Sequence, residues 1–339
     1  MHLDAYLFPP SLNSVPIVAS AAERMGFSAL WTTETRHDPF LPAALIAEHT
    51  KRLFFGTAVA ISFARSPATL AYTAWDLSQT SAGRFILGLG TQVRAHIERR
   101  FGMPWPDSVV GKLREQVSAI RAFWQCWQNG TPLNFRGNYY KLTLMSPFFN
   151  PGSIEHPSIP IYLAGVNAGL MRLAGEVADG FHVHPFHSVD YLRRVILPSI
   201  EQGAARVGRK RSDIHISVTA FVVTDAEDEL NVRSQIAFYG STPSYRPVLA
   251  LHGWGEIGEQ LSALAARSQW DKMPDLINQE MLETFAVVAP TSRLAQALLD
   301  RYEGWADRLT LYLPFVPGER DELWRTLLAE IPKAQPLIP

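Results

Sequence analysis

The stretch that decides the fold is residues 53–92, LFFGTAVAISFARSPATLAYTAWDLSQTSAGRFILGLGTQ. It opens with the apolar run 53–61, which is typical of a strand buried on both faces. Ser66-Pro67 then predicts the start of a helix, because serine caps a helix and proline fits its first turn. Gly83 predicts the end of that helix, and the apolar run 84–89 predicts a second strand. The segment therefore reads strand, helix, strand.

The same alternation continues along the chain. Further short apolar runs lie at 3–8, 28–33, 161–164, 181–184, 214–223 and 309–313. Patterns typical of amphipathic helices separate them. Eight strands with intervening helices predict an α/β fold, a (β/α)8 TIM barrel with insertions. We expect residues 1–339 to form a single domain.

Two segments interrupt the alternation. A hairpin is expected at 133–140, with Arg136-Gly137 near its turn. The connection between the seventh and eighth strands is far longer than a crossover needs. Helical patterns within 225–290 predict an inserted cap beside the barrel mouth.

Composition narrows the functional classes. The chain has 339 residues, 47% hydrophobic and 19% charged, with a formal net charge of −1. This balance gives no basic excess for nucleic acid, and no stretch reaches the ~18 apolar residues of a membrane span. The start has no signal-peptide pattern, so we expect a cytoplasmic protein without nucleic-acid or membrane partners. Cys126 is the only cysteine, which excludes an internal disulfide.

The carboxyl ends of barrel strands meet at one mouth, where active sites of such barrels lie. The second strand ends in Glu34, followed by His37 and Asp38. A carboxylate and an imidazole suit acid–base chemistry, so we predict Glu34 and His37 as catalytic residues. In the alternative interpretation, Glu34 pairs with Arg36 or caps a loop.

Three other strand ends suit a flat, phosphate-bearing ligand. Ala58, Val59 and Ala60 are small enough for a planar ring to approach the backbone, unless they only pack the barrel core. Gly88 and Gly90, before Thr91 and Gln92, leave bare backbone for the same ligand. Gly165-Val166-Asn167 precedes a helix whose first N–H groups would bind a phosphate, although Asn167 has a purely capping alternative.

A histidine cluster leaves a metal site open. His182 and His184 point to the same side of one strand, and His187 follows shortly after. Imidazoles at this spacing can share a metal ion, which would suit a metal-dependent hydrolase. No carboxylate accompanies them on that strand, so we predict no metal site.

Several motifs, in order along nearly the whole chain, resemble the bacterial-luciferase-like flavin monooxygenase superfamily. They are GRFILGLG at 83–90 after Arg65-Ser66-Pro67, and IYLAG at 161–165 leading to AGEVADG at 174–180. Within the superfamily the chain most resembles the coenzyme F420-dependent oxidoreductases. WTTETRHDPF at 31–40 and FYGSTP at 238–243 are similar to one branch of them.

The resemblance implies a coenzyme, F420 with FMN as the alternative, held at the barrel mouth. It implies a bulge at the end of the third strand, with a cis peptide at Ala58–Val59 that supports the coenzyme ring. Phosphate contacts would come from Gly165, Val166 and Asn167 and from the loop of His184, Phe186 and His187. Gly90, Thr91 and Gln92 would meet the ring edge.

The sequence also departs from relatives of known substrate type. The sugar-phosphate dehydrogenases carry an Asp-His pair where this chain has Glu34-Thr35, and an acid where it has Gln92-Val93. A sugar phosphate is therefore disfavoured as the substrate. His187 stands where a phosphate-binding lysine is expected, which keeps FMN open.

The functional hypothesis is hydride transfer between F420 and a small organic substrate, with Tyr245 and Arg246 of the cap closing over that substrate. The alternatives are an FMN monooxygenase supplied by a partner reductase, a metal-dependent hydrolase and a non-catalytic coenzyme carrier. A homodimer is expected, because members of this family are often dimers.

Overall fold

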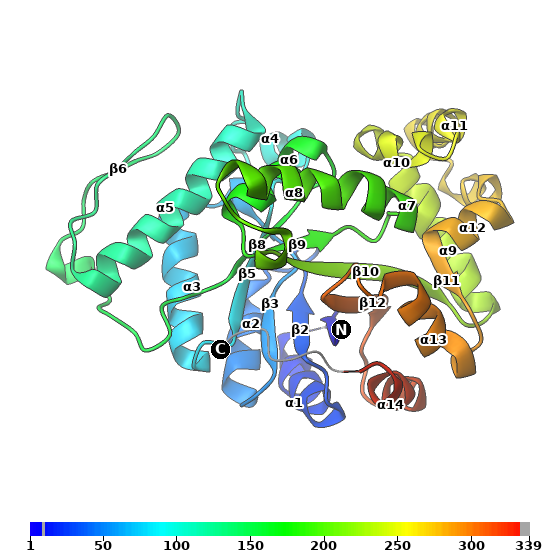
Figure 1. The fold of residues 1–339 in the computed structure, drawn as a ribbon, viewed down its shortest axis with the longest axis horizontal. Coiled ribbons are helices and arrows are strands. Elements are labelled where there is room, and N and C mark those ends of the chain that lie inside the picture. Colours follow the sequence, from blue (N-terminus) through cyan, green and yellow to red (C-terminus); the bar gives the residue numbers. More distant parts are fainter. Residues whose placement is uncertain (9–10, 333–339) are drawn as a thin grey trace.

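The computed structural model describes residues 1–8 and 11–332, and its centre is a closed barrel of parallel strands (Figure 1). The barrel strands are β1 (His2–Leu7), β2 (Ala29–Thr32), β3 (Phe54–Thr57), β5 (Phe85–Gly90), β8 (Ile161–Ala164), β9 (Gly180–Val183), β10 (His215–Val223) and β12 (Arg308–Pro314). They pair in this order, and β12 pairs back to β1. The predicted (β/α)8 barrel is confirmed.

Helices surround the barrel and shield the outer faces of its strands (Figure 1). The larger ones are α1 (Val15–Met25), α2 (Phe40–His49), α3 (Pro67–Ser81), α5 (Val109–Asn129), α6 (Ala168–Val177), α8 (Leu197–Arg206), α13 (Thr291–Tyr302) and α14 (Asp321–Glu330). Each buries an apolar face, as α5 does with Leu113, Val117 and Ile120. In the described part of the chain, every helix falls short of the length or apolar character needed to cross a bilayer.

The deciding segment folds as predicted with one exception. The Ser66 hydroxyl accepts a hydrogen bond from the Thr69 N–H at 3.1 Å, which caps α3. The expected continuous strand 53–61 is wrong, because β3 stops at Thr57 and the chain resumes as β4 (Ala60–Ile61). Between them the chain turns inward and places Val59 against β5, which interrupts the pairing of a regular strand.

Inside the barrel, polar and aromatic side chains replace the usual aliphatic filling. Arg308 and Asp4 form an ion pair at 2.6 Å, and both are almost fully buried. The Trp31 indole N–H donates to the same carboxylate at 2.9 Å. The Tyr162 ring lies beside the Trp31 ring, so this half of the barrel core depends on one charged cluster.

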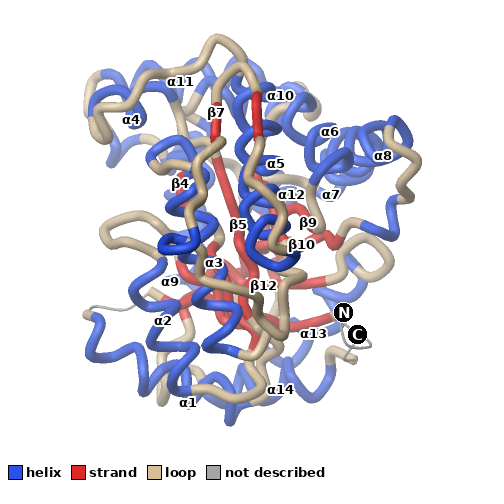
Figure 2. Tube along the Cα trace, turned by 90° about the vertical axis from the view of Figure 1, so that its left-hand side faces the viewer, coloured by secondary structure: helices blue, strands red, loops and turns tan. Residues whose placement is uncertain are grey.

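The long connection between β10 and β12 holds α9 (Ala226–Gly240), α10 (Arg246–Ala250), α11 (Gly255–Ala266), α12 (Gln279–Phe285) and β11 (Ala286–Val288). β11 extends the sheet beyond the barrel by pairing with the last three residues of β10. Figure 2 shows α10 and α11 at the same end of the molecule as α4 (Arg94–Arg99), which follows the carboxyl end of β5. The role of 225–290 as a cap stays a prediction.

The predicted hairpin is present but lies further along the chain. Its strands are β6 (Phe135–Arg136) and β7 (Lys141–Leu142), so the turn covers 137–140. The Glu115 carboxylate accepts hydrogen bonds from the backbone N–H groups of Asn138 and Tyr139, both at 2.8 Å. This contact from α5 fixes the turn. The residues of the hairpin itself do not predict the contact.

Candidate functional site

The residues predicted to bind the coenzyme phosphate come together at the carboxyl end of the barrel. A small cavity there is lined by residues of both predicted loops and of the cap, among them Gly165, Val166, His184, Phe186, His187 and Tyr245. The Asn167 side chain accepts a hydrogen bond from the Leu170 N–H at 2.9 Å, so Asn167 caps α6, and a phosphate contact of this loop stays a prediction. The amino terminus of α6 therefore lies beside the cavity, where its backbone N–H groups and dipole suit a phosphate.

The histidines of this region are held neutral. Burial lowers the pKa of His182 and of His184 to about 3, and that of His187 to about 4. His187 shares hydrogen bonds with the His184 carbonyl oxygen at 2.8 Å and with the Tyr302 hydroxyl at 3.2 Å. These two bonds use both ring nitrogens, so His187 brings neither a charge nor a free polar group to the cavity.

The two histidines of the metal hypothesis have different surroundings. His182 lies within the barrel against the Trp31 ring, and its Nε2 atom is buried without a hydrogen-bond partner. His184 lies instead against the rings of Tyr239 and Tyr245. Across residues 1–8 and 11–332, no three His, Cys, Asp or Glu side chains gather into a possible metal site. The geometry thus gives the hydrolase alternative no support.

The end of β3 has the backbone that the family resemblance implied. The peptide between Ala58 and Val59 is cis. The expectation of bare backbone at Gly88 and Gly90 is corrected, because other groups fill both positions. A Cβ on Gly88 would overlap the Thr57 carbonyl oxygen, and one on Gly90 would lie 2.5 Å from Val59 Cγ2. The glycines admit the inward turn of the chain, where Ala58 and Val59 are partly exposed and Ala60 is buried.

Glu34 is fixed by two hydrogen bonds to one of its oxygens. Its Oε2 accepts from the Ile61 N–H and from the Arg65 guanidinium, each at 2.7 Å. Arg65 also donates to Asp38 at 2.7 Å. Burial lowers the Arg65 pKa, but hydrogen bonds with the two carboxylates outweigh this and raise it. Glu34 therefore forms an ion pair, as the alternative interpretation predicted, but its partner is Arg65 and not Arg36.

The other residues predicted near Glu34 are either exposed or bonded to groups of their own loop. His37 is exposed on the loop after β2, whereas Glu34 is buried. Gln92 has a left-handed backbone, φ 59°, and its Oε1 accepts from the Val93 N–H at 2.9 Å. The Thr91 hydroxyl donates to the Gln92 carbonyl oxygen at 3.2 Å. Contacts of these groups with a coenzyme stay predictions.

Sequence reasoning named Tyr245 but did not bring together four tyrosines at the mouth, which we call the tyrosine wall: Tyr6, Tyr239, Tyr245 and Tyr312. Tyr312 follows Arg308 and Thr310 on the inward face of β12, so strand alternation contained the signal. Tyr245, predicted to contact substrate, belongs to this wall. Arg246 packs along α11, with Cγ 3.8 Å from where a Cβ on Gly258 would lie.

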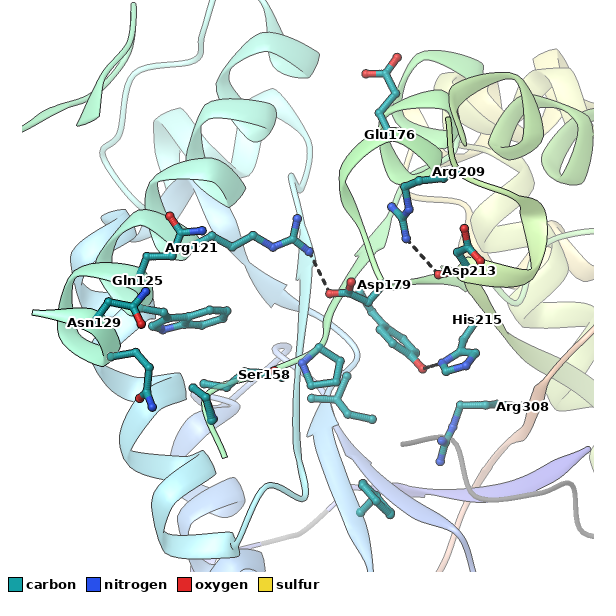
Figure 3. A pocket seen from close by; sticks show the side chains of 18 residues that line it. Arg121, Gln125, Asn129, Ser158, Glu176, Asp179, Arg209, Asp213, His215 and Arg308 are labelled. Atoms are coloured by element: carbon teal, nitrogen blue, oxygen red, sulfur yellow. Dashed lines mark hydrogen bonds and ion pairs between the residues drawn. The ribbon is translucent and has the colours of Figure 1, made fainter. Parts of the chain in front are cut away.

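A second cavity of about 700 Å³ opens at the other end of the barrel, where Tyr162, His215 and Arg308 lie near the starts of their strands. Figure 3 shows Arg121 and Asp179 reaching across it to form an ion pair, at 3.0 Å. Its charged groups are already paired with protein partners, and this end of a TIM barrel serves stability. The chemistry therefore belongs at the carboxyl end.

Comparisons with known proteins agree with this placement. A family model described as luciferase-like monooxygenase matches residues 2–308. An uncharacterized protein of Mycobacterium tuberculosis is 47% identical over 89% of this chain and 90% of its own. A putative coenzyme F420-dependent oxidoreductase of the same organism is 28% identical, covering 82% and 84%.

A solved structure has the same fold. The coenzyme F420-dependent tetrahydromethanopterin reductase of Methanopyrus kandleri superposes with a TM-score of 0.78 at 19% identity, covering 97% of this chain and 98% of that one. The match of the family model to almost the whole barrel decides the assignment. This chain belongs to the luciferase-like monooxygenase family.

Proposed function

We propose that this protein is an oxidoreductase that transfers a hydride between coenzyme F420 and a small organic substrate. The observation that carries the proposal is the kinship, over most of the chain, with a putative F420-dependent oxidoreductase. The convergence of both predicted phosphate loops on one cavity supports it. The coenzyme would supply the hydride chemistry, and the chain would bind and orient both reactants.

The residues present fit such a coenzyme. The cavity beside α6 offers the first backbone N–H groups of that helix, which suit a phosphate ester. The chain at Ala58 and Val59 would flank the ring. The neutral His187 gives no cation for the phosphate, which favours binding through the helix terminus instead of through a salt bridge.

Titration of the purified protein with oxidised F420 and with FMN, followed by fluorescence quenching, tests the proposal. We expect F420 to bind at least about tenfold more tightly, a difference of about 1.4 kcal/mol. The reverse preference, with oxygen uptake when a reductase supplies reduced FMN, would establish the monooxygenase alternative that the family's name supports. Binding of both without turnover of any alcohol or carbonyl compound would indicate a coenzyme carrier.

Glu34 is proposed as the acid–base residue, because only its Oε2 is used by Ile61 and Arg65. Glu34→Gln keeps an acceptor for the Ile61 N–H but removes the proton-transfer group. Turnover should fall about 10²- to 10⁴-fold, with F420 affinity unchanged. Asp38→Asn is the matched control, since it also removes a partner of Arg65 but from an exposed position. Equal activity losses in the two variants would assign Glu34 a purely structural role.

The assembly is proposed on kinship alone. We propose a homodimer, and for the FMN alternative a reductase partner. Light scattering of the purified protein distinguishes a dimer from a monomer, and it is independent of the coenzyme test.

A further inference from the structure

The tyrosine wall forms one continuous surface at the carboxyl end of the barrel. Tyr312 lies in its middle, with ring centroids 6.5 Å from Tyr6 and 6.4 Å from Tyr239. Tyr245 lies 6.0 Å from Tyr239. His184 contacts both of these rings, at 4.5 and 4.6 Å. The wall is therefore continuous with the residues predicted to bind the coenzyme.

One hydroxyl of this wall is free to reach a ligand. The hydroxyl groups of Tyr239 and Tyr312 are 2.8 Å apart and share a hydrogen bond. One bond between two hydroxyls uses the proton of only one of them. Tyr239 is the more buried of the two and has less access to any other acceptor, so we infer that Tyr239 is the donor. The Tyr312 proton then has no protein acceptor among the described contacts, and the Tyr312 side chain is 37% exposed and open to a ligand.

Three rings of the wall, Tyr6, Tyr239 and Tyr245, are uncharged at neutral pH. Burial raises the pKa of Tyr6 to about 12 and also raises the pKa values of Tyr239 and Tyr245. In the cluster of Glu34, Asp38 and Arg65, one guanidinium is shared by two carboxylates. Neither the four rings nor this cluster supplies an uncommitted cation, so both disfavour an anionic substrate.

We propose that Tyr312, held by its hydrogen bond with Tyr239, donates a hydrogen bond to a carbonyl or hydroxyl oxygen of an uncharged, planar substrate lying against the tyrosine wall. Aromatic side chains bind planar apolar groups with offset or edge contacts, and one phenolic donor fixes the direction of the oxygen. This inference rests on the proposed function, because it names the substrate class for the same mouth.

The binding of three matched probes tests this proposal. Binding is measured by ligand-observed NMR titration of the purified protein. Acetophenone is a neutral aromatic ketone, α-methylstyrene has the same shape without the oxygen, and benzoate carries a charge. The wild type should bind acetophenone about tenfold more tightly than either other probe, as expected for one hydrogen bond in a partly buried site. Tyr312→Phe should abolish the preference for acetophenone over α-methylstyrene.

Two further variants make the result specific. Tyr239→Phe should reduce the preference less, because Tyr312 keeps its own donor. Tyr72→Phe removes a tyrosine hydroxyl that donates to the Phe149 carbonyl oxygen away from the mouth, so it should leave the preference intact. Equal binding of acetophenone and α-methylstyrene by the wild type, an undiminished preference in Tyr312→Phe, or tighter binding of benzoate would overturn the proposal.

The binding readout separates this inference from the proposed function. The titrations are repeated with whichever coenzyme the protein binds, and no turnover is required. A protein that prefers FMN but loses its ketone preference in Tyr312→Phe would refute F420-dependent hydride transfer and leave the role of Tyr312 standing. A protein that prefers F420 and shows no effect of Tyr312→Phe would refute the role of Tyr312 and leave F420-dependent hydride transfer standing.

Discussion

Asp4→Asn is expected to lower the free energy of unfolding by about 3–5 kcal/mol, because it leaves a charged guanidinium without its counter-ion inside the barrel. Arg308 is only 1% exposed, and Asp4 is its ion-pair partner at 2.6 and 2.8 Å. The same carboxylate accepts from the Trp31 indole. Urea denaturation followed by circular dichroism measures the change.

Two controls separate charge from packing. Glu98→Gln breaks an exposed pair with Arg94 one helical turn away, and such pairs contribute well under about 1 kcal/mol. A double variant with Asp4→Leu and Arg308→Met removes both charges together, so its loss should be much smaller than that of the single variant. If Asp4→Asn lowered the free energy of unfolding no more than Glu98→Gln, the buried ion pair would not stabilise the barrel interior.

Gly88→Ala is expected to destabilise the protein by about 3 kcal/mol or more, at the upper end of overpacking effects. The added methyl would overlap the Thr57 carbonyl oxygen and lie 3.0 Å from His182 Nε2. Backbone on one side and a buried ring on the other leave no flexible group to yield. Thermal denaturation should show a fall in Tm of roughly 6–12 °C, given about 2–4 °C per kcal/mol for large domains.

The same substitution should also disturb the mouth. The Thr57 hydroxyl donates to the Gly88 carbonyl oxygen at 2.6 Å, and the same hydroxyl accepts from the Gly88 N–H at 3.0 Å. Forcing these strands apart displaces Ala58 and Val59, which we expect to lie beside the coenzyme, so F420 affinity should fall. Gly255→Ala is the control, because a Cβ there meets nothing within 4 Å. Wild-type stability in Gly88→Ala would show that β3 and β5 can separate at no cost.

The fold was readable from the sequence because its signals are local. Short apolar runs, a serine-proline start and glycine stops lie within a few residues of the elements that they define, as at Ser66 and Gly26. Strand alternation also placed the mouth, since parallel strands in one barrel end together. The apolar pattern of 53–61 did not show the interruption of the third strand, which only the family resemblance implied, because the interruption depends on space provided by Gly88 and Gly90, much later in the chain.

Only part of the candidate site could be predicted from the sequence, because the rest depends on contacts between residues far apart in the chain. The residues near the ends of β3, β5, β8 and β9 follow directly from strand positions. Arg65 was read as part of a helix start, and only the fold brings it to the Glu34 carboxylate at 2.7 Å. The tyrosine wall joins β1, α9, the short turn before α10 and β12, so no sequence window contains it.

The sequence by itself determined the barrel, the order of its elements and the mouth where chemistry belongs, because periodicity and capping act over a few residues. The tertiary structure decided which charged groups pair with each other and which hydroxyl groups share a hydrogen bond. Those outcomes depend on distances between side chains far apart in the chain, such as the 2.8 Å between the hydroxyls of Tyr239 and Tyr312. Closure of the barrel sets these distances, and local sequence carries no record of them.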